Sequence, residues 1–357
     1  MTRLRITCIT LAMLYLTGCA TVGPQSLARD RFRYTDAISD SWKRQMLLNM
    51  VKIRYADTPI FLDVSSIISQ QLVEAEFTGS LSWNAFLPTD SQTVKGRSRY
   101  ADRPTITYQP LMGEKFTKSL MTPIRPAAIL SLVQSGRPVD ILFRVCIESV
   151  NGIYNRVDGR VRTHQADPDF YRLIDSLQKI QDSMAVGTRI RETEDGKQAT
   201  MISFRKKDID PDIVAEINIA KKLLGLNPGL QEFKVSQGAV AQDDQEIAIL
   251  SRSMLEILQE LAAYIDVPET HVAEQRAAPN LVDDKEMAGD IPPLLRVQSD
   301  SKKPADAFVA VKYRDHWFWI DDRDFKSKKI FSFLMFLFTL AETGTPQPAP
   351  VLTIPTG

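Results

Sequence analysis

The sequence predicts an α+β fold, with mixed or antiparallel sheets and packed helices. Three observations predict it: stretches with an apolar stripe at helical spacing, stretches in which apolar and polar residues alternate, and a C-terminal aromatic β-hairpin followed by an apolar helix. The chain has 357 residues, of which 44% are hydrophobic, so it can form one large or two medium domains.

The first half of the chain predicts a long helix followed by strands. Residues 36–55 carry an apolar stripe at helical spacing, and this helix is expected to end before Pro59. The other elements expected here are strands over 60–86 and 105–109, short helices over 114–121 and 126–134, and an apolar strand over 139–150.

Local signals mark the elements of the second half. Proline in the first helical turn marks two helices, and a capping box marks a third. The signals are Asp167-Pro168, Asp210-Pro211 and the pair Ser253 and Glu256. Between the first two helices, residues 188–204 predict a hairpin that turns at Asp195-Gly196, a pair that tolerates positive φ.

Residues 308–320 hold the most concentrated aromatic segment and predict two strands that turn near Arg314-Asp315. Strand alternation places Trp317 and Trp319 on one face and Phe318 on the other. Both faces are apolar, so we expect both to be covered. The main interpretation is core packing, and the alternative is a platform on which the sugar rings of glycan strands stack.

A last helix is expected to be capped by Asp324 or Ser327, and its residues 330–341 are almost wholly apolar. Twelve residues reach about 18 Å, too short to cross a bilayer, so this helix must be buried. It can be buried within its own domain, against another subunit or partner, or in a membrane surface. The lysines of its first turn are expected to pair with the aspartates before it. The candidate interaction surface consists of Trp317, Trp319, Phe333 and Phe336.

The N-terminus has the features of a secretory signal. Arg3 and Arg5 precede an apolar run over residues 6–16. A helix of this length covers about 16 Å, against about 30 Å of bilayer hydrocarbon. A permanent transmembrane anchor is therefore the weaker interpretation.

The apolar run closes with Leu16, Thr17, Gly18 and Cys19. These residues resemble the lipobox of bacterial lipoproteins. The resemblance implies cleavage before Cys19 and lipidation of that cysteine, and three acyl chains suffice for stable membrane anchoring. The alternative is an ordinary cleaved signal with a chance cysteine. In Gram-negative lipoproteins an aspartate after the cysteine favours the inner membrane, so Ala20 implies the periplasmic face of the outer membrane, with the inner membrane as the alternative.

The charges argue against nucleic acid as a partner. Without residues 1–18, which hold Arg3 and Arg5, the chain keeps 42 of its 44 basic and all 44 acidic side chains, a net charge of −2. The charges are interspersed, whereas phosphate binding needs a basic face. Cys146 lies in an apolar run and is expected to be a buried, inert thiol. Since Cys19 would carry lipid, no intramolecular disulfide is expected.

The absence of known catalytic motifs argues against several enzyme classes. No histidine lies in HExxH or beside a second metal ligand at helical spacing, so neither metal nor cofactor is expected. GxSxG, P-loop and GxGxxG motifs are absent. A glycosidase needs only two carboxylates and leaves no motif, so that activity stays open. Glu148, Asp158 and Asp167 stand out no more than other acids, and no catalytic residue is assigned.

Polar and proline-rich stretches divide the chain into expected parts. These parts are a signal peptide (1–18), a flexible tether (19–34), an α+β domain (35–266), a flexible linker or excursion (267–306), a β-hairpin plus apolar helix packed on the main domain (307–344) and a Pro-rich tail (345–357).

Four segments of the body also resemble an uncharacterised family of bacterial lipoproteins: FLDVSSI, PVDILFRV, ILSRSMLEIL and HWFWIDDRDFKSKKIFSFLMFLF. This resemblance implies one recurring α+β unit and no particular activity. We therefore expect a non-catalytic, lipid-anchored envelope protein that acts as a scaffold or adaptor for other envelope proteins. The alternatives are a peptidoglycan- or glycan-binding or glycan-cleaving lipoprotein and, more weakly, a carrier of a small molecule or lipid.

Overall fold

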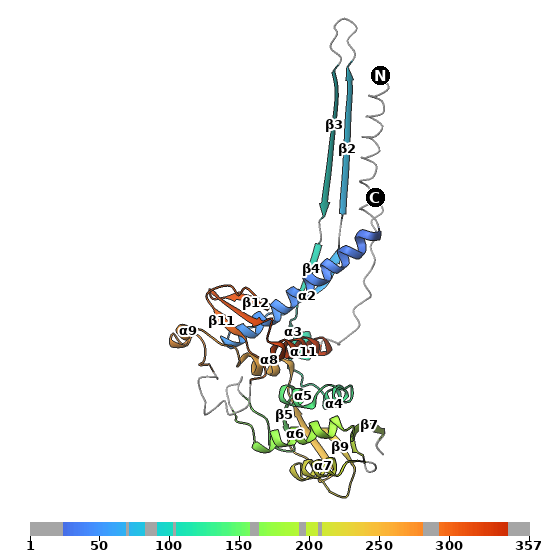
Figure 1. Cartoon of the computed structure of the whole chain (residues 1–357), viewed down its shortest axis with the longest axis vertical. Helices are drawn as coiled ribbons and strands as arrows, with labels where there is room; N and C mark the ends of the chain where they lie inside the picture. The colour runs from blue at the N-terminus through green and yellow to red at the C-terminus, as the bar shows by residue number, and fades with distance from the viewer. Residues whose placement is uncertain are drawn as a thin grey trace. The chain divides into compact units, whose positions relative to one another are not determined.

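The fold was determined as a computed structural model, and it confirms the α+β class, with helices, antiparallel sheets and one mixed sheet (Figure 1). The described residues are 24–68, 71–82, 91–102, 105–157, 164–192, 198–205, 209–280 and 293–341. Residues 16–19, which resemble a lipobox, the turn expected at Asp195-Gly196 and the expected tail lie outside them. The chain divides into two compact units, one of residues 1–59 and 117–343 and one of residues 60–116 and 344–357.

The first unit contains a six-stranded sheet in the order β6-β5-β10-β9-β8-β7. Its strands are β5 (Ile147–Val150), β6 (Ile153–Tyr154), β7 (Val186–Glu192), β8 (Gln198–Phe204), β9 (Glu232–Gln237) and β10 (Glu246–Ser251). Neighbouring strands are antiparallel except β9 and β10, which run parallel. The sheet is therefore mixed, and the hairpin expected over 188–204 is confirmed in its two strands.

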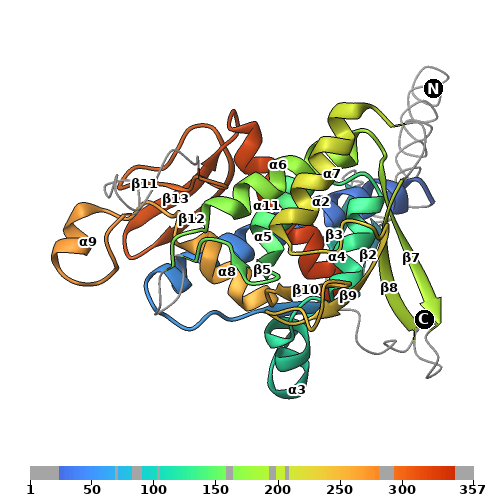
Figure 2. The same ribbon diagram turned by 90° about the horizontal axis from the view of Figure 1, so that it is seen from below.

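Helices pack on one face of this sheet (Figure 2). They are α4 (Pro126–Gln134), α5 (Val139–Cys146), α6 (Pro168–Asp182) and α7 (Pro211–Leu223). Lys221 of α7 lies over the rings of Phe204 and Phe233, which belong to this face. On the opposite face Met201 is half-buried and Lys234 is exposed. The sheet thus carries its core on one side.

A second, antiparallel sheet has the order β11-β13-β12. Its strands are β11 (Gln298–Asp300), β12 (Ala307–Tyr313) and β13 (His316–Asp321). The hairpin between β12 and β13 turns at Arg314 and Asp315 as expected, and both have positive φ, 46° and 64°, as a two-residue turn requires. Phe318 is fully buried, with its ring centroid 6.0 Å from that of Tyr55, whereas Trp317 and Trp319 are half-buried. Both faces were expected to be covered, and the tryptophan face is less covered than the face of Phe318.

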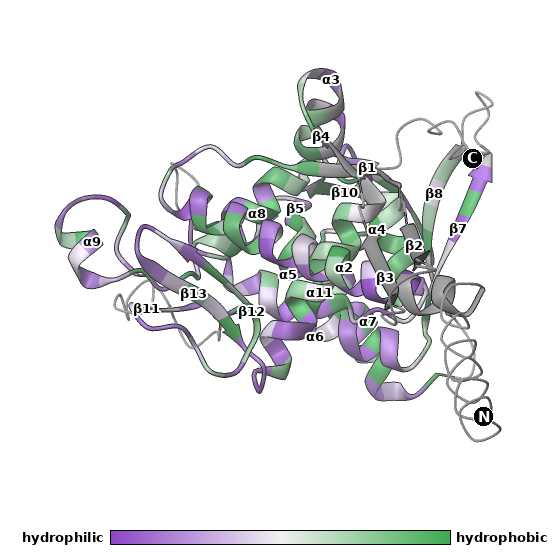
Figure 3. Cartoon of the chain, turned by 90° about the horizontal axis from the view of Figure 1, so that it is seen from above, coloured by the Kyte–Doolittle hydropathy of each residue, from purple (hydrophilic) through white to green (hydrophobic). Residues whose placement is uncertain are grey.

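Three further helices of this unit are α2 (Pro24–Arg54), α8 (Met254–Ala262) and α11 (Phe325–Ala341). Apolar residues gather on α8 and α4 (Figure 3). The expected capping box of α8 is present, because the side chains of Ser253 and Glu256 each accept from the other's backbone N–H, at 3.3 and 2.8 Å. Asp324 caps α11 by accepting from Ser327 N at 3.0 Å.

Helix α11 is buried within its own unit, which was one of the three expected environments. Ile330, Phe331 and Leu334 are at most 2% exposed. The expected pairing of a lysine with a preceding aspartate is seen between Lys328 and Asp322, at 2.7 Å. Among the described residues, no helix combines the length and the apolar character needed to cross a membrane.

The second unit is built from two-stranded antiparallel ribbons. β1 (Leu62–Ile68) pairs with β4 (Thr105–Pro110), and β2 (Gln71–Ser82) pairs with β3 (Ser91–Asp102) along their full lengths. A single helical turn, α3 (Gly113–Phe116), follows. Strands were expected at β1, β2 and β4. Strand β3 was not, because its sequence SQTVKGRSRYAD has almost no alternating apolar residues.

Residues 139–150 do not form the expected strand. Helix α5 occupies 139–146, and only the last four residues form β5. Val139, Leu142 and Cys146 recur at helical spacing and are buried, so the apolar run is the inner face of a helix. Cys146 is fully buried as expected, and burial raises the pKa of its thiol to about 12.

Two stretches expected to be flexible contain regular structure. Helix α2 begins at Pro24, within the expected tether, because Pro fits the first helical position and no Gly or further Pro occurs up to Arg54. The expected linker 267–306 contains α9 (Glu269–Ala273) and β11, with Leu295 fully buried. Residues 281–292 of that linker lie outside the described part.

Candidate binding cavity

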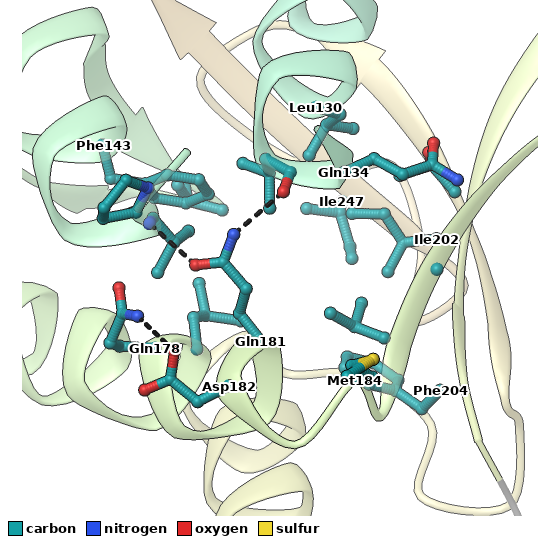
Figure 4. A pocket seen from close by; sticks show the side chains of 18 of the residues that line it. Leu130, Gln134, Phe143, Gln178, Gln181, Asp182, Met184, Ile202, Phe204 and Ile247 are labelled. Atoms are coloured by element: carbon teal, nitrogen blue, oxygen red, sulfur yellow. Dashed lines mark hydrogen bonds between the residues drawn. The ribbon is translucent and has the colours of Figure 1, made fainter. Parts of the chain in front are cut away.

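A cavity of about 560 Å³ lies in the first unit, between the main sheet and helices α4, α5 and α6 (Figure 4). Its lining comes from three helices and four strands, several of them distant in sequence. The lining includes Leu130, Gln134, Val139, Phe143, Val150, Gln178, Gln181, Asp182, Met184, Val186, Thr188, Ile202, Phe204, Ile247 and Ile249.

The sheet forms one wall of the cavity. Ile202 and Phe204 of β8 are two residues apart, and so are Ile247 and Ile249 of β10. Residues at this spacing point to the same face of a strand, which explains why both pairs reach the cavity. All four side chains are buried, so this wall is apolar.

Helices form the opposite wall. Val139 and Phe143 of α5 lie one helical turn apart and are both buried, and Leu130 of α4 is buried beside them. The cavity is therefore enclosed by aliphatic and aromatic side chains from both layers. Ligand pockets of proteins commonly have this volume and composition.

Gln181 of α6 holds the helical wall together. Its Oε1 accepts from Val139 N at 3.0 Å, and its Nε2 donates to the carbonyl oxygens of Val133 and Arg137 at 2.9 and 2.8 Å. One side chain thus binds the end of α4 and the start of α5, whose terminal backbone groups lack helical partners. Gln178 is engaged too, because its Nε2 donates to Asp182 Oδ1 at 2.8 Å (Figure 4).

The exposed lining residues mark the mouth of the cavity. Gln134, Asp182 and Met184 are exposed, and Met184 is 77% exposed with a φ of 54° just beyond the end of α6. Thr188 of β7 donates from Oγ1 to Gln134 Oε1 at 2.5 Å. The mouth therefore combines one large apolar side chain with neutral hydrogen-bonding groups and the carboxylate of Asp182.

Asp182 is the one ionisable residue that lines the cavity among the described residues, and it is exposed. The described lining includes no histidine, cysteine, lysine or arginine. The arrangement can bind an apolar group, and the lining residues that the structure describes include no nucleophile beside a base and no pair of carboxylates.

The candidate interaction surface is divided between two elements. Trp317 and Trp319 lie on β13, with Lys303 Nζ 5.5 Å from the Trp317 ring centroid. Phe333 is buried and Phe336 is 39% exposed on α11. The two phenylalanines line a separate hollow of about 180 Å³, whose described lining includes neither tryptophan.

The carboxylates considered from the sequence do not form a site. Asp167 accepts from Tyr154 N at 2.7 Å just before α6, which is a structural role. Glu148 is half-buried on β5, and Asp158 lies outside the described residues. Within the described part, no group of three or more metal-binding side chains could hold a metal ion.

Sequence reasoning did not predict the cavity. The one local signal was Gln181, which continues the apolar stripe of Phe170, Ile174 and Leu177 on α6. A glutamine in such a stripe indicates a polar contact inside the core. Comparisons with protein-family models, curated proteins and solved structures find no match for this chain.

Proposed function

We propose that the protein is a non-catalytic, lipid-anchored protein of the bacterial envelope that binds an apolar group and acts as a scaffold or adaptor for other envelope components. The observation that carries the binding role is the apolar cavity of about 560 Å³ in the first unit. Binding there removes apolar ligand surface from water, which contributes about 0.8 kcal/mol per buried methylene.

Membrane attachment is proposed through Cys19. Its support is the resemblance of residues 16–19 to a lipobox, and Ala20 favours the periplasmic face of the outer membrane over the inner membrane. Cys19→Ser is expected to release the protein from membranes and to abolish incorporation of labelled fatty acid. A wild-type protein that takes up no fatty acid, with a variant that still sediments with membranes, would contradict the anchor.

The scaffold role is tested by crosslinking the full-length protein in cells, with Cys19→Ser as the control. Proteins and lipids that purify with it are then identified by mass spectrometry. We expect a small set of envelope proteins, recovered only when Cys19 is present, together with an extractable apolar ligand. A protein that captures no partner and holds no extractable ligand would contradict the proposal.

A second candidate function is glycan binding through Trp317 and Trp319. Both side chains are half-buried on the central strand of the second sheet and lie two residues apart on one face. Exposed aromatic faces on a rigid strand can stack against sugar rings. If Trp317→Ala keeps the fold but loses binding to isolated cell-wall sacculi, glycan binding is supported, whereas unchanged binding excludes this role for Trp317.

A further inference from the structure

We infer that the cavity takes a single-chain amphiphile with an uncharged head group. The acyl chain enters between the sheet and the helices, and the head group stays at the rim formed by Gln134, Asp182 and Thr188. This inference rests on the proposed function, because it names the class of ligand for the same cavity.

The size and walls of the cavity select the chain. Its volume of about 560 Å³ lies within the range of pockets that enclose drug-sized molecules. One acyl chain is a molecule of that size. The deep residues Val150, Phe204 and Ile249 are buried and offer no hydrogen bond. A polar head group placed there would lose its water without gaining a partner, so it must remain at the mouth.

Charge at the mouth selects the head group. An ionised carboxylate or phosphate needs a cation or several N–H donors when it leaves water. The described lining has no basic residue, and its one charged group, Asp182, repels an anion. A fatty acid anion is therefore disfavoured relative to an uncharged lipid with the same chain.

Three basic residues that are close in sequence to residues of the mouth make their contacts with other parts of the protein. The guanidinium of Arg137 lies 5.5 Å from the ring centroid of Phe336, in the separate hollow beside α11. Arg189 pairs with Glu232 at 3.5 Å, and Lys179 pairs with Glu216 at 2.6 Å. None of these contacts places a cation at the rim.

The neutral groups of the rim suit hydroxyl groups. The Thr188 hydroxyl donates to the side-chain oxygen of Gln134 across the mouth. The hydroxyl oxygen of Thr188 can still accept a hydrogen bond, and the amide nitrogen of Gln134 can donate one to a ligand. A glycerol head group can exchange hydrogen bonds with both. Gln178 and Gln181 are held by protein partners and position the wall.

The test measures displacement of the fluorescent probe N-phenyl-1-naphthylamine from the full chain carrying Cys19→Ser, which needs no detergent. The competitors are 1-monopalmitoylglycerol, palmitate and hexadecyltrimethylammonium, which share a sixteen-carbon chain and differ in charge. We expect monopalmitoylglycerol to bind at least tenfold more tightly than palmitate. Equal or tighter binding of palmitate, or tenfold tighter binding of the cation, overturns the inference.

Variants locate the binding site. Val186 faces the cavity, so Val186→Trp is expected to weaken probe and monopalmitoylglycerol binding at least tenfold. Ile190→Trp is the matched control, because Ile190 lies on the same face of β7, is 73% exposed and does not line the cavity. Thr188→Trp replaces the first variant if circular dichroism shows that Val186→Trp is unfolded. Unchanged binding by a folded cavity variant overturns the inference.

Asp182 is tested through selectivity. The affinity for palmitate relative to that for monopalmitoylglycerol is expected to rise about threefold in Asp182→Asn and at least tenfold in Asp182→Lys. An unchanged relative affinity in Asp182→Lys contradicts the assignment of the rim. If no probe or lipid binds the parent chain, the binding role itself fails. If lipids bind without preference for the uncharged head, only the inference fails.

Discussion

The guanidinium of Arg252 closes the C-terminal end of helix α5, where its Nη1 donates to the carbonyl oxygen of Arg144 at 3.1 Å. It also donates to the carbonyl oxygens of Val145 and Arg156, at 3.3 and 2.5 Å. The side chain is only 1% exposed. A cation at a helix C-terminus is stabilised by the helix dipole, so backbone carbonyls take the place of a carboxylate partner.

Arg252→Met is therefore expected to leave buried carbonyl groups without donors and to lower the free energy of unfolding by about 3 kcal/mol. Urea denaturation followed by circular dichroism measures the change. Arg323→Met is the control, because Arg323 is 82% exposed and a surface ion pair contributes about 0–1 kcal/mol. Equal stability of the two variants would contradict the structural role of Arg252.

Gln181→Leu tests the helical wall of the cavity. It removes one acceptor and two donors that hold Val133, Arg137 and Val139, and we expect the free energy of unfolding to fall by about 2 kcal/mol. Urea denaturation is again the measurement. Gln237→Leu, at an exposed position at the end of β9, should change stability by less than about 0.5 kcal/mol. A larger loss in the control than in Gln181→Leu would refute the role of this glutamine.

Glu216 links α6 to α7, and its links predict a pH dependence. Hydrogen bonds from Lys179, at 2.6 Å, and from Ser176 lower the pKa of its carboxyl. Because the pKa of this carboxyl is lower in the folded state than in the unfolded state, the ionised carboxylate stabilises the fold at pH values above the unfolded-state pKa. That contribution disappears as the pH falls through the folded-state pKa. Glu216→Gln should therefore cost about 1 kcal/mol at pH 7 and progressively less below about pH 4. A difference that persists unchanged at pH 2.5 would exclude this linkage.

His271 predicts a second loss of stability on acidification, at a higher pH than that of Glu216. Burial, and next the neighbouring His316, lower the pKa of its imidazole, whose Nδ1 lies 2.7 Å from the Tyr55 hydroxyl oxygen. The folded state disfavours the proton, so stability is lost as the pH falls from the unfolded value of about 6.5 toward the folded pKa. His271→Gln should reduce the difference in unfolding free energy between pH 7.5 and pH 5. An identical difference in both proteins would show that His271 is not responsible.

The sequence by itself determined the α+β class and the elements whose signals are local. Asp210 accepts from Asp212 N, and Ser253 and Glu256 bind each other's backbone, within two or three residues of chain. The turn at Arg314-Asp315 likewise depends on the φ angles of two adjacent residues. Such features can be predicted from the sequence, because the residues that contact one another are neighbours in the chain. The resemblance of residues 16–19 to a lipobox is also a local signal, and both that assignment and lipidation of Cys19 stay predictions.

Only the tertiary structure decided how residues 139–150 fold and where the cavity lies. An apolar run can be a strand or the inner face of a helix, and Arg252, more than 100 residues away, supplies the cation that ends α5 after Cys146. The cavity brings Leu130 of α4 together with Ile249 of β10. Its volume is the space left between packed layers, so it depends on distances between elements that no local pattern contains.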